Sequence, residues 1–520
     1  MTDAYTVAAP AHSRSTDTQM LLSRNASSVF VLRVMCISAN MARNPLYRSN
    51  HLAVHTYRGH WNRPATKSVV SFDMERTYNW AWVESAVSAA IADWNSCAHL
   101  PVHHGSLFGR REQENKEAVY DQALLAVERE AKLARRGPVE RREAQRRIVA
   151  IFPRFASLAL GLEDQAVHLL TDGFLPIGTQ FTQWARRFDP DLSIADTIQA
   201  CRNAWTVCGI QPLVGDRMQM TPAIIGYSLL YPYSDNYLDS GKISKERKLE
   251  FSERFRDRLC GLEIFPRDRH ESAVWAMVRL IEDQFPRVHF PRVYECLLAI
   301  HRAQENSMAQ MKSARRLSHP ELLRLTFAKG GTSVLADACL SHGFLSDEEA
   351  RFAFEWGVLL QLGDDLQDVQ EDVKQGSTTL FSLAAAAGRP LDSLVRQLLA
   401  FSESVADQIE RLPHGELALK RLLRTSWRSL ILMAVARSHR YFTPEFLAEL
   451  ERASSFRFDF LRTRHKLLAG RRGLYKVLFE SFLQSEDVDL THLPRPEDWL
   501  ASTGKSDPSD RMRAVVGSLA

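Results

Sequence analysis

The chain has 520 residues, of which 45% are hydrophobic and 25% are charged, a composition typical of a soluble globular protein. A formal net charge of +4 is small for this length and predicts that the protein does not bind nucleic acid. Its seven cysteines form no Cys-x-x-Cys pair, which favours reduced thiols in a cytoplasmic protein and argues against a zinc site.

The chain divides into segments of different character. No apolar run approaches the roughly 18 residues that would cross a membrane, and no stretch shows strand-like alternation, so we expect an all-α protein. Residues 118–148 are rich in Glu and Arg and are interrupted by Gly137-Pro138, which predicts a helical hairpin with solvated faces. The expected parts are a flexible segment at 1–70, a helical N-terminal extension at 71–192, a larger helical domain at 193–485 and a loosely ordered tail at 486–520.

A predicted helix begins at Thr221-Pro222, which fit the N-cap and the first helical position. Pro232 is expected to kink this helix or to restart it. Asp235 and Asp239 lie four residues apart at the end of its apolar run, so both carboxylates share one helical face. Two aspartates at this spacing are common, and the pair is informative only with a second acidic motif.

A glycine pair stands within a helical pattern further along the chain. Gly330 and Gly331 follow Lys329 directly, and each glycine costs a helix interior about 1 kcal/mol relative to alanine. The pair therefore indicates either the close approach of another group or the end of a helix, and the sequence leaves both interpretations open.

The most informative stretch is a predicted helix that begins at Ser346, where Glu349 completes a capping box three residues later. Its first half is apolar, and Asp364, Asp368 and Asp372 then recur every four residues. Like charges at this spacing cost roughly 0.2–0.5 kcal/mol per pair, whereas bound Mg²⁺ would reverse the sign of that cost. We therefore expect these acids to line the mouth of a cavity; a solvated acidic face is the alternative.

Together the two acidic motifs resemble the aspartate-rich motifs of the class I isoprenoid synthases, the superfamily of trans-prenyltransferases and terpene cyclases. The resemblance covers residues 195–445 and implies a helical bundle around a deep apolar cavity. The matching residues are Asp235, Asn236 and Asp239 for the first motif, where Asn occupies the second position, and Gln361, Asp364, Asp365 and Asp368 for the second.

The resemblance implies a Mg²⁺-dependent enzyme, with about three ions bound as in the family, that ionises an allylic prenyl diphosphate. The two motifs would stabilise the diphosphate leaving group as the C–O bond breaks, with Asp235, Asp239, Asp364 and Asp368 as the catalytic residues. The implied metal ligands are Asp235, Asp239, Asp364, Asp365, Asp368 and Asp372.

Other residues are implied to contact the substrate. Lys329 lies where the family has a lysine-bearing helix, and Arg440-Tyr441 resembles a late pair that contacts diphosphate in bacterial terpene cyclases. Aromatic side chains would line the cavity and stabilise a cation, although each could equally be ordinary core. The implied diphosphate-binding residues are Lys329, Gln361, Arg440 and Tyr441, and the implied cavity residues are Tyr227, Tyr231 and Trp356.

Three functions are weighed on these motifs. A cyclase or related synthase is favoured by the degenerate first motif and by Arg440-Tyr441. It is also favoured by the absence of the arginine pair that follows the first motif in chain-elongating enzymes. The intact second motif favours a chain-elongating prenyltransferase, in which Tyr231 would resemble the aromatic plug that shortens products; such enzymes imply a homodimer. The third is a non-catalytic scaffold or regulatory subunit of the same fold.

Overall fold

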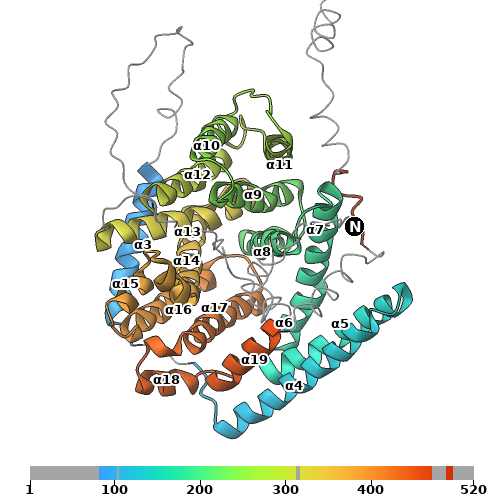
Figure 1. The fold of residues 1–520 in the computed structure, drawn as a ribbon, viewed down its shortest axis with the longest axis vertical. Coiled ribbons are helices and arrows are strands. Elements are labelled where there is room, and N and C mark those ends of the chain that lie inside the picture. Colours follow the sequence, from blue (N-terminus) through green and yellow to red (C-terminus); the bar gives the residue numbers. More distant parts are fainter. Residues whose placement is uncertain (1–80, 102–104, 312–316, 471–487, 496–520) are drawn as a thin grey trace, which may run out of the picture.

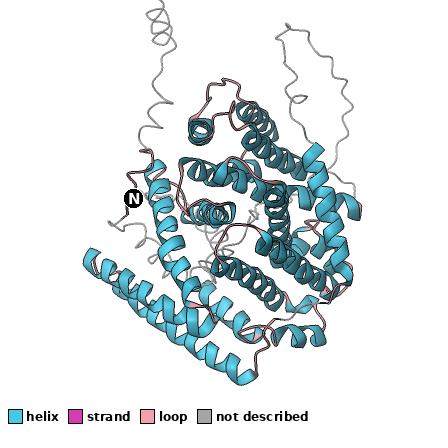
Figure 2. Ribbon diagram, turned by 180° about the vertical axis from the view of Figure 1, so that it is seen from behind, coloured by secondary structure: helices cyan, strands magenta, loops and turns pink. Residues whose placement is uncertain are grey.

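The computed structural model consists of helices and connecting loops, with no strand in the part of the chain that it describes (Figure 2). The expectation of an all-α protein is thus confirmed there. The residues described are 81–101, 105–311, 317–470 and 488–495. The expected flexible segment at 1–70 lies outside them, as do residues 496–520 of the expected tail.

The helices surround a central pair, α13 and α14, which α3, α8, α9, α12, α16 and α17 enclose (Figure 1). Their bounds are α3 Ala81–Ser96, α4 Arg110–Leu133, α5 Pro138–Leu160, α6 Asp164–His168, α7 Leu175–Phe188, α8 Ile194–Ile210, α9 Pro222–Asp239, α10 Lys245–Leu259, α11 Arg269–Gln284, α12 Pro291–Met311, α13 His319–His342, α14 Asp347–Gln375, α15 Leu380–Ala386, α16 Asp392–Arg411, α17 Leu417–Arg437, α18 Pro444–Glu451 and α19 Phe458–Gly470.

The central pair is held together by glycines at its crossing. A Cβ atom at Gly357 of α14 would lie 2.1 Å from the carbonyl oxygen of Gly330, and one at Gly331 would lie 2.4 Å from the ring of Phe354. Helix α13 continues through both of its glycines. The glycine pair thus marks a close approach, as one of the two interpretations predicted, and the alternative of a helix end is wrong.

Local signals define the ends of the two acidic helices. Ser346 and Glu349 form the predicted capping box of α14, and Gly376 ends that helix with a φ of 71°, a conformation that glycine adopts without strain. The hydroxyl of Thr221 accepts a hydrogen bond from the backbone N–H at the start of α9. Helix α9 runs without interruption through Pro232, so it does not restart there.

Helix α3 packs onto the central helices. Arg324 of α13 donates to Glu84 at 3.0 Å, and Arg351 of α14 donates to Asp93 at 2.6 Å. The ring of Trp94 makes edge-on contacts with those of Phe327 and Phe401. Residues 81–96, which the sequence assigned to an extension, therefore contribute to the core around α13 and α14.

Helices α4 and α5 form the predicted hairpin, with Gly137-Pro138 at the turn. The hairpin lies along one edge of the molecule (Figure 1). The loop between α18 and α19 holds the start of the hairpin: the backbone N–H of Phe108 donates to the carbonyl of Arg452 at 2.7 Å, and Arg457 binds Glu117 of α4. These contacts join segments about 340 positions apart in sequence.

Part of the expected tail is also attached to the bundle. The indole N–H of Trp184 in α7 donates to the carbonyl of Pro494 at 2.8 Å, and Gln180 donates to the carbonyl of Asp489 at 3.2 Å. Among the described residues, no helix combines the length and the apolar character needed to pass through a bilayer.

The glycine crossing gives a stability test on a single helix. Gly357→Ala should lower the free energy of unfolding by about 1–3 kcal/mol, because the added methyl group has no room against Gly330. Gly363→Ala is the matched control: a Cβ there would meet nothing within 4 Å, and removing glycine from a helix interior should stabilise by roughly 0.4–1 kcal/mol. Urea denaturation followed by circular dichroism measures both; equal effects would contradict the packing argument.

Candidate functional site

The acids of α14 lie beside a small cavity where four helices meet. Asp364, Asp365 and Asp372 are buried, and Asp368 is half-buried. The cavity has a volume of about 60 Å³ and is lined by residues of α8, α9, α13 and α14. From α14 it takes Gln361 and Asp364, so the acidic helix does face an interior space at this position. The other lining residues are Gln199, Arg202, Asn203, Thr206, Tyr231, Gly330, Ser333, Val334, Asp337, Gly357 and Leu360.

Arg202 of α8 faces these acids and was not predicted as a site residue. Its side chain is 7% exposed, and all three guanidinium nitrogens lack a hydrogen-bond partner among the described residues. Burial lowers the pKa of Arg202 to about 10, and the charges of Asp364 and Asp368 act in the opposite direction. The signal that could have found it is a lone arginine within the apolar periodicity of its helix.

A second guanidinium approaches from α17. Burial lowers the pKa of Arg437, and the charge of Asp368 opposes that shift. Arg437 lies three residues before the predicted Arg440, whose side chain is exposed and stacks on its neighbour Tyr441 with 4.8 Å between the guanidinium carbon and the ring centroid. The role of Arg440 and Tyr441 in binding diphosphate therefore stays a prediction, and Arg437 is the arginine of α17 that interacts with Asp368.

The wall opposite α14 is polar. Asn203 donates to Asp337 at 3.0 Å, and the hydroxyl of Tyr231 hydrogen-bonds to that of Ser333. The hydroxyl of Tyr227 donates to the carbonyl of Ser333 at 3.3 Å. Burial raises the pKa of Asp337 well above its ordinary value, which favours the neutral acid over a buried carboxylate without a cation.

The first acidic motif borders a neighbouring cavity of about 50 Å³, between α9, α10 and α12. Asp235 lines it, and Tyr231 lines both this cavity and the one beside Asp364. The structure therefore brings the two motifs to adjoining cavities that share one tyrosine. Asn236 donates to Asp196 at 2.7 Å. Asp239 is the last residue of α9, and its side chain is not among those described.

The remaining predicted residues of the site have different surroundings. Gln361 donates to Asp365 at 2.9 Å, so these two second-motif residues contact each other. Lys329 is buried on α13, next to the glycine that lines the cavity. Trp356 is fully buried, with ring centroids 5.5 Å from Phe352 and 5.4 Å from Trp427; its contacts are those of the core. The deep apolar cavity stays a prediction, since both cavities at the motifs are small.

The carboxylate oxygens of the two motifs are ligands that a hard cation such as Mg²⁺ prefers. They do not, however, form a complete metal site in the part of the chain that the structure describes. Among the described residues, no three His, Cys, Asp or Glu side chains converge as a ready metal site. Mg²⁺ is usually held by one or two carboxylates together with waters and substrate phosphate. Carboxylates spaced along α14, beside Arg202, fit such a shared site better than a site made of protein ligands alone.

Arginines that follow the first motif are engaged elsewhere. Arg254 donates two hydrogen bonds to Glu271, at 2.8 and 2.7 Å, and Arg258 donates to Glu282 at 2.6 Å. They contribute to the packing of α10 against α11. Neither lines the cavity of either motif.

Comparisons of the chain with protein-family models, curated proteins and solved structures found no match. The isoprenoid-synthase resemblance thus depends on the two sequence motifs.

The buried state of Arg202 predicts that it contributes little to stability. Arg202→Met relieves the cost of burying a guanidinium that makes no hydrogen bond, but it also takes a cation away from Asp364 and Asp368. These two effects oppose each other, so the free energy of unfolding should change by less than about 1 kcal/mol. Arg254→Met is the matched control, because it leaves the buried Glu271 without its partner and should cost about 3 kcal/mol. Urea denaturation compares the two. A loss at Arg202 as large as at Arg254 would show that its guanidinium serves the fold.

Proposed function

We propose that the protein is a Mg²⁺-dependent class I terpenoid synthase that ionises an allylic prenyl diphosphate. The observation that carries the proposal is the buried Arg202, which faces Asp364 and Asp368 without a hydrogen-bond partner in the described residues. A guanidinium beside a row of carboxylates is the combination that a metal–diphosphate complex needs: anions for the cation, and a cation for the anion.

Energetics supports a ligand at this position. Burying a guanidinium costs several kcal/mol unless hydrogen bonds and charges offset the loss of water. At Arg202 the charges of Asp364 and Asp368 do so, and no hydrogen bond to a described residue adds to them. Diphosphate oxygens would supply acceptors for its N–H groups, and charge-assisted bonds of this kind are roughly twice as strong as neutral ones. Burying the Arg202 guanidinium without a ligand thus lowers the stability of the free protein, which is typical of residues whose role is to bind a ligand.

Each residue has a defined part in this proposal. Asp364 and Asp368 would hold Mg²⁺ from α14, and Asp235 would do so from α9. When bound, the metal supplies charge stabilisation for the departing diphosphate. Arg202, Arg437 and the nearby Lys329 would bind its oxygens and fix its orientation. The packed helices would exclude water from the allylic cation.

A synthase is favoured over a chain-elongating transferase by the arginines after the first motif. Arg254 and Arg258 are paired with glutamates, so they are not presented to a second diphosphate. The transferase is the second candidate, because Tyr231 lies one turn before Asp235 and separates the two cavities, which is where a plug that limits chain length would lie. Consumption of isopentenyl diphosphate distinguishes the two reactions.

Turnover tests the proposal. Purified protein with Mg²⁺ and C10 to C25 prenyl diphosphates, with and without isopentenyl diphosphate, should release inorganic diphosphate and a hydrocarbon or alcohol. Asp364→Asn should lower kcat/KM at least about 100-fold, because it weakens the binding of the Mg²⁺ that would stabilise the departing diphosphate. Glu348→Gln, which alters an exposed acid on the same helix, should leave it unchanged.

Four outcomes separate the candidates. Products formed without isopentenyl diphosphate support the synthase. Longer diphosphates formed only in its presence would replace it by the transferase. Wild-type turnover in Asp364→Asn would contradict both, and a complete absence of turnover would favour the non-catalytic scaffold.

A further inference from the structure

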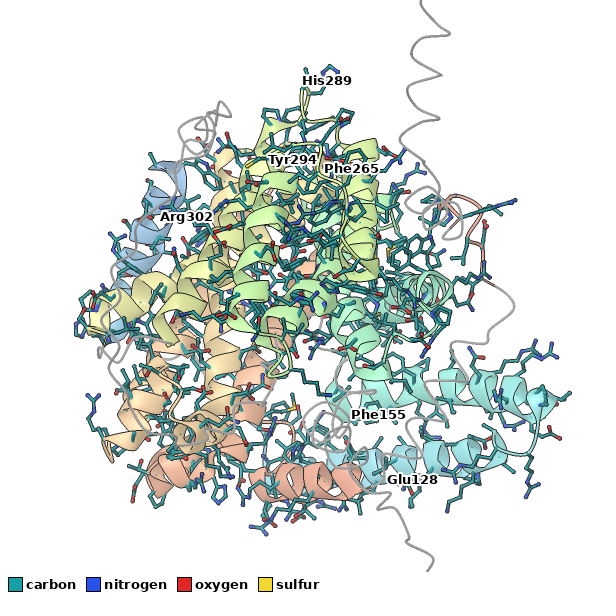
Figure 3. All side chains as sticks on the ribbon, turned by 45° about the horizontal axis from the view of Figure 1, so that its top comes forward. Glu128, Phe155, Phe265, His289, Tyr294 and Arg302 are labelled. Carbon is teal, nitrogen blue, oxygen red and sulfur yellow. The ribbon has the colours of Figure 1, made fainter. Side chains whose placement is uncertain are left out.

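A third and much larger cavity lies between the N-terminal hairpin and the C-terminal helices. Its volume is about 800 Å³, within the range of roughly 300–1,000 Å³ that is usual for small-molecule sites. Its walls come from the start of α4, the end of α5, α16, α17, the loop before α19 and α19 itself. No acid of either motif lines it. Figure 3 places this hairpin, marked by Glu128 of α4 and Phe155 of α5, far from His289 and Phe265.

One face of α17 forms a continuous wall of this cavity, and its chemistry changes along the helix. Thr425, Arg428 and Ser429 are followed by Leu432 and Met433, at spacings that keep all five on one side of the helix. The wall is therefore polar and basic in the middle of α17 and apolar towards its end.

Three cations, Lys116, Arg424 and Arg428, and two acids, Glu112 and Glu403, line this cavity. Arg428 is mostly buried; burial lowers its pKa, and Glu403, 3.5 Å away, opposes the shift. Glu403 is shared with Arg424 at 3.2 Å. Lys116 lines the same space, with its ammonium nitrogen 5.4 Å from the ring centroid of Phe108, and it forms no ion pair with the described residues.

The start of the hairpin covers this basic region. A Cβ atom at Gly105 would lie 3.3 Å from the guanidinium carbon of Arg428, so the loop before α4 rests on that side chain. Low dielectric surroundings strengthen the attraction of such a cation for an anion. Apolar side chains complete the enclosure, among them Phe108, Phe456 and Leu461.

We propose that this cavity binds a single-chain lipid phosphate, with its headgroup at Lys116 and Arg428 and its hydrocarbon chain against Leu432, Met433 and Phe456. Two cations together with the hydroxyls of the α17 wall match a phosphate, which carries up to two charges and three acceptor oxygens. The chain would lie on the apolar end of the same wall. This site goes beyond the proposed function and does not depend on it.

Calorimetric titration with dodecyl phosphate, below its micelle concentration and with EDTA present, tests the site without the metals that the aspartates would need. The full-length protein should bind one equivalent. Lys116→Gln should weaken binding at least about tenfold, through loss of a charge-assisted contact, and Ser429→Trp should abolish it by filling the cavity. Lys132→Gln, an exposed lysine on the same helix, is the control. Farnesyl phosphate in place of dodecyl phosphate shows whether a prenyl or an alkyl chain fits better.

Binding that survives both Lys116→Gln and Ser429→Trp, or equal binding of dodecyltrimethylammonium, would overturn the proposal, as would no binding of either phosphate. Asp364→Asn should bind dodecyl phosphate like the wild type. Its loss of turnover and the loss of lipid binding in Ser429→Trp are thus separate results, so either proposal can fail alone.

Discussion

At the centre of the molecule the backbone of α13 lies against that of α14, because Gly330, Gly331 and Gly357 leave no side chain between the two helices. This contact fixes the rotation of α14. Its apolar first half is then turned into the core, where Trp356 packs on Trp427, and Asp364 is turned towards the cavity below α8. A side chain at the crossing would separate the helices, and the acids would no longer meet Arg202.

Polar groups line the cavity beside the crossing of α13 and α14. Arg202 and Arg437 approach the acids from two sides, while Asp337 and Tyr231 bind polar partners on the opposite wall. Buried polar groups are costly unless they are paired, and Arg202 has no hydrogen-bond partner among the described residues, so the packing of the fold alone does not account for it. The large cavity beside α17 is different in kind, because three of its five charged lining side chains are basic and neither acidic motif lines it.

The sequence correctly predicted helix caps and a helix break, which depend on residues close together in the chain. The capping box at Ser346, the N-cap at Thr221 and the break at Gly137-Pro138 depend on residues within one helical turn, and all three were found. The acidic spacing located one side of the candidate site. Arg202 escaped prediction because its significance depends on α14, more than 150 positions later, and so did Asp337, whose partner Asn203 is 134 positions away. The packing of residues 81–96 on the core depends on equally distant contacts.

The central claim is that Arg202 and the acids of α14 bind Mg²⁺ and diphosphate together. The most direct measurement is the melting temperature of the wild-type protein with MgCl₂, with inorganic diphosphate, and with both. The account predicts clear stabilisation only with both, by about 2.7 kcal/mol at a hundred times the dissociation constant, and loss of that stabilisation in Arg202→Met. No shift with the combination, or the same shift in Arg202→Met, would contradict it.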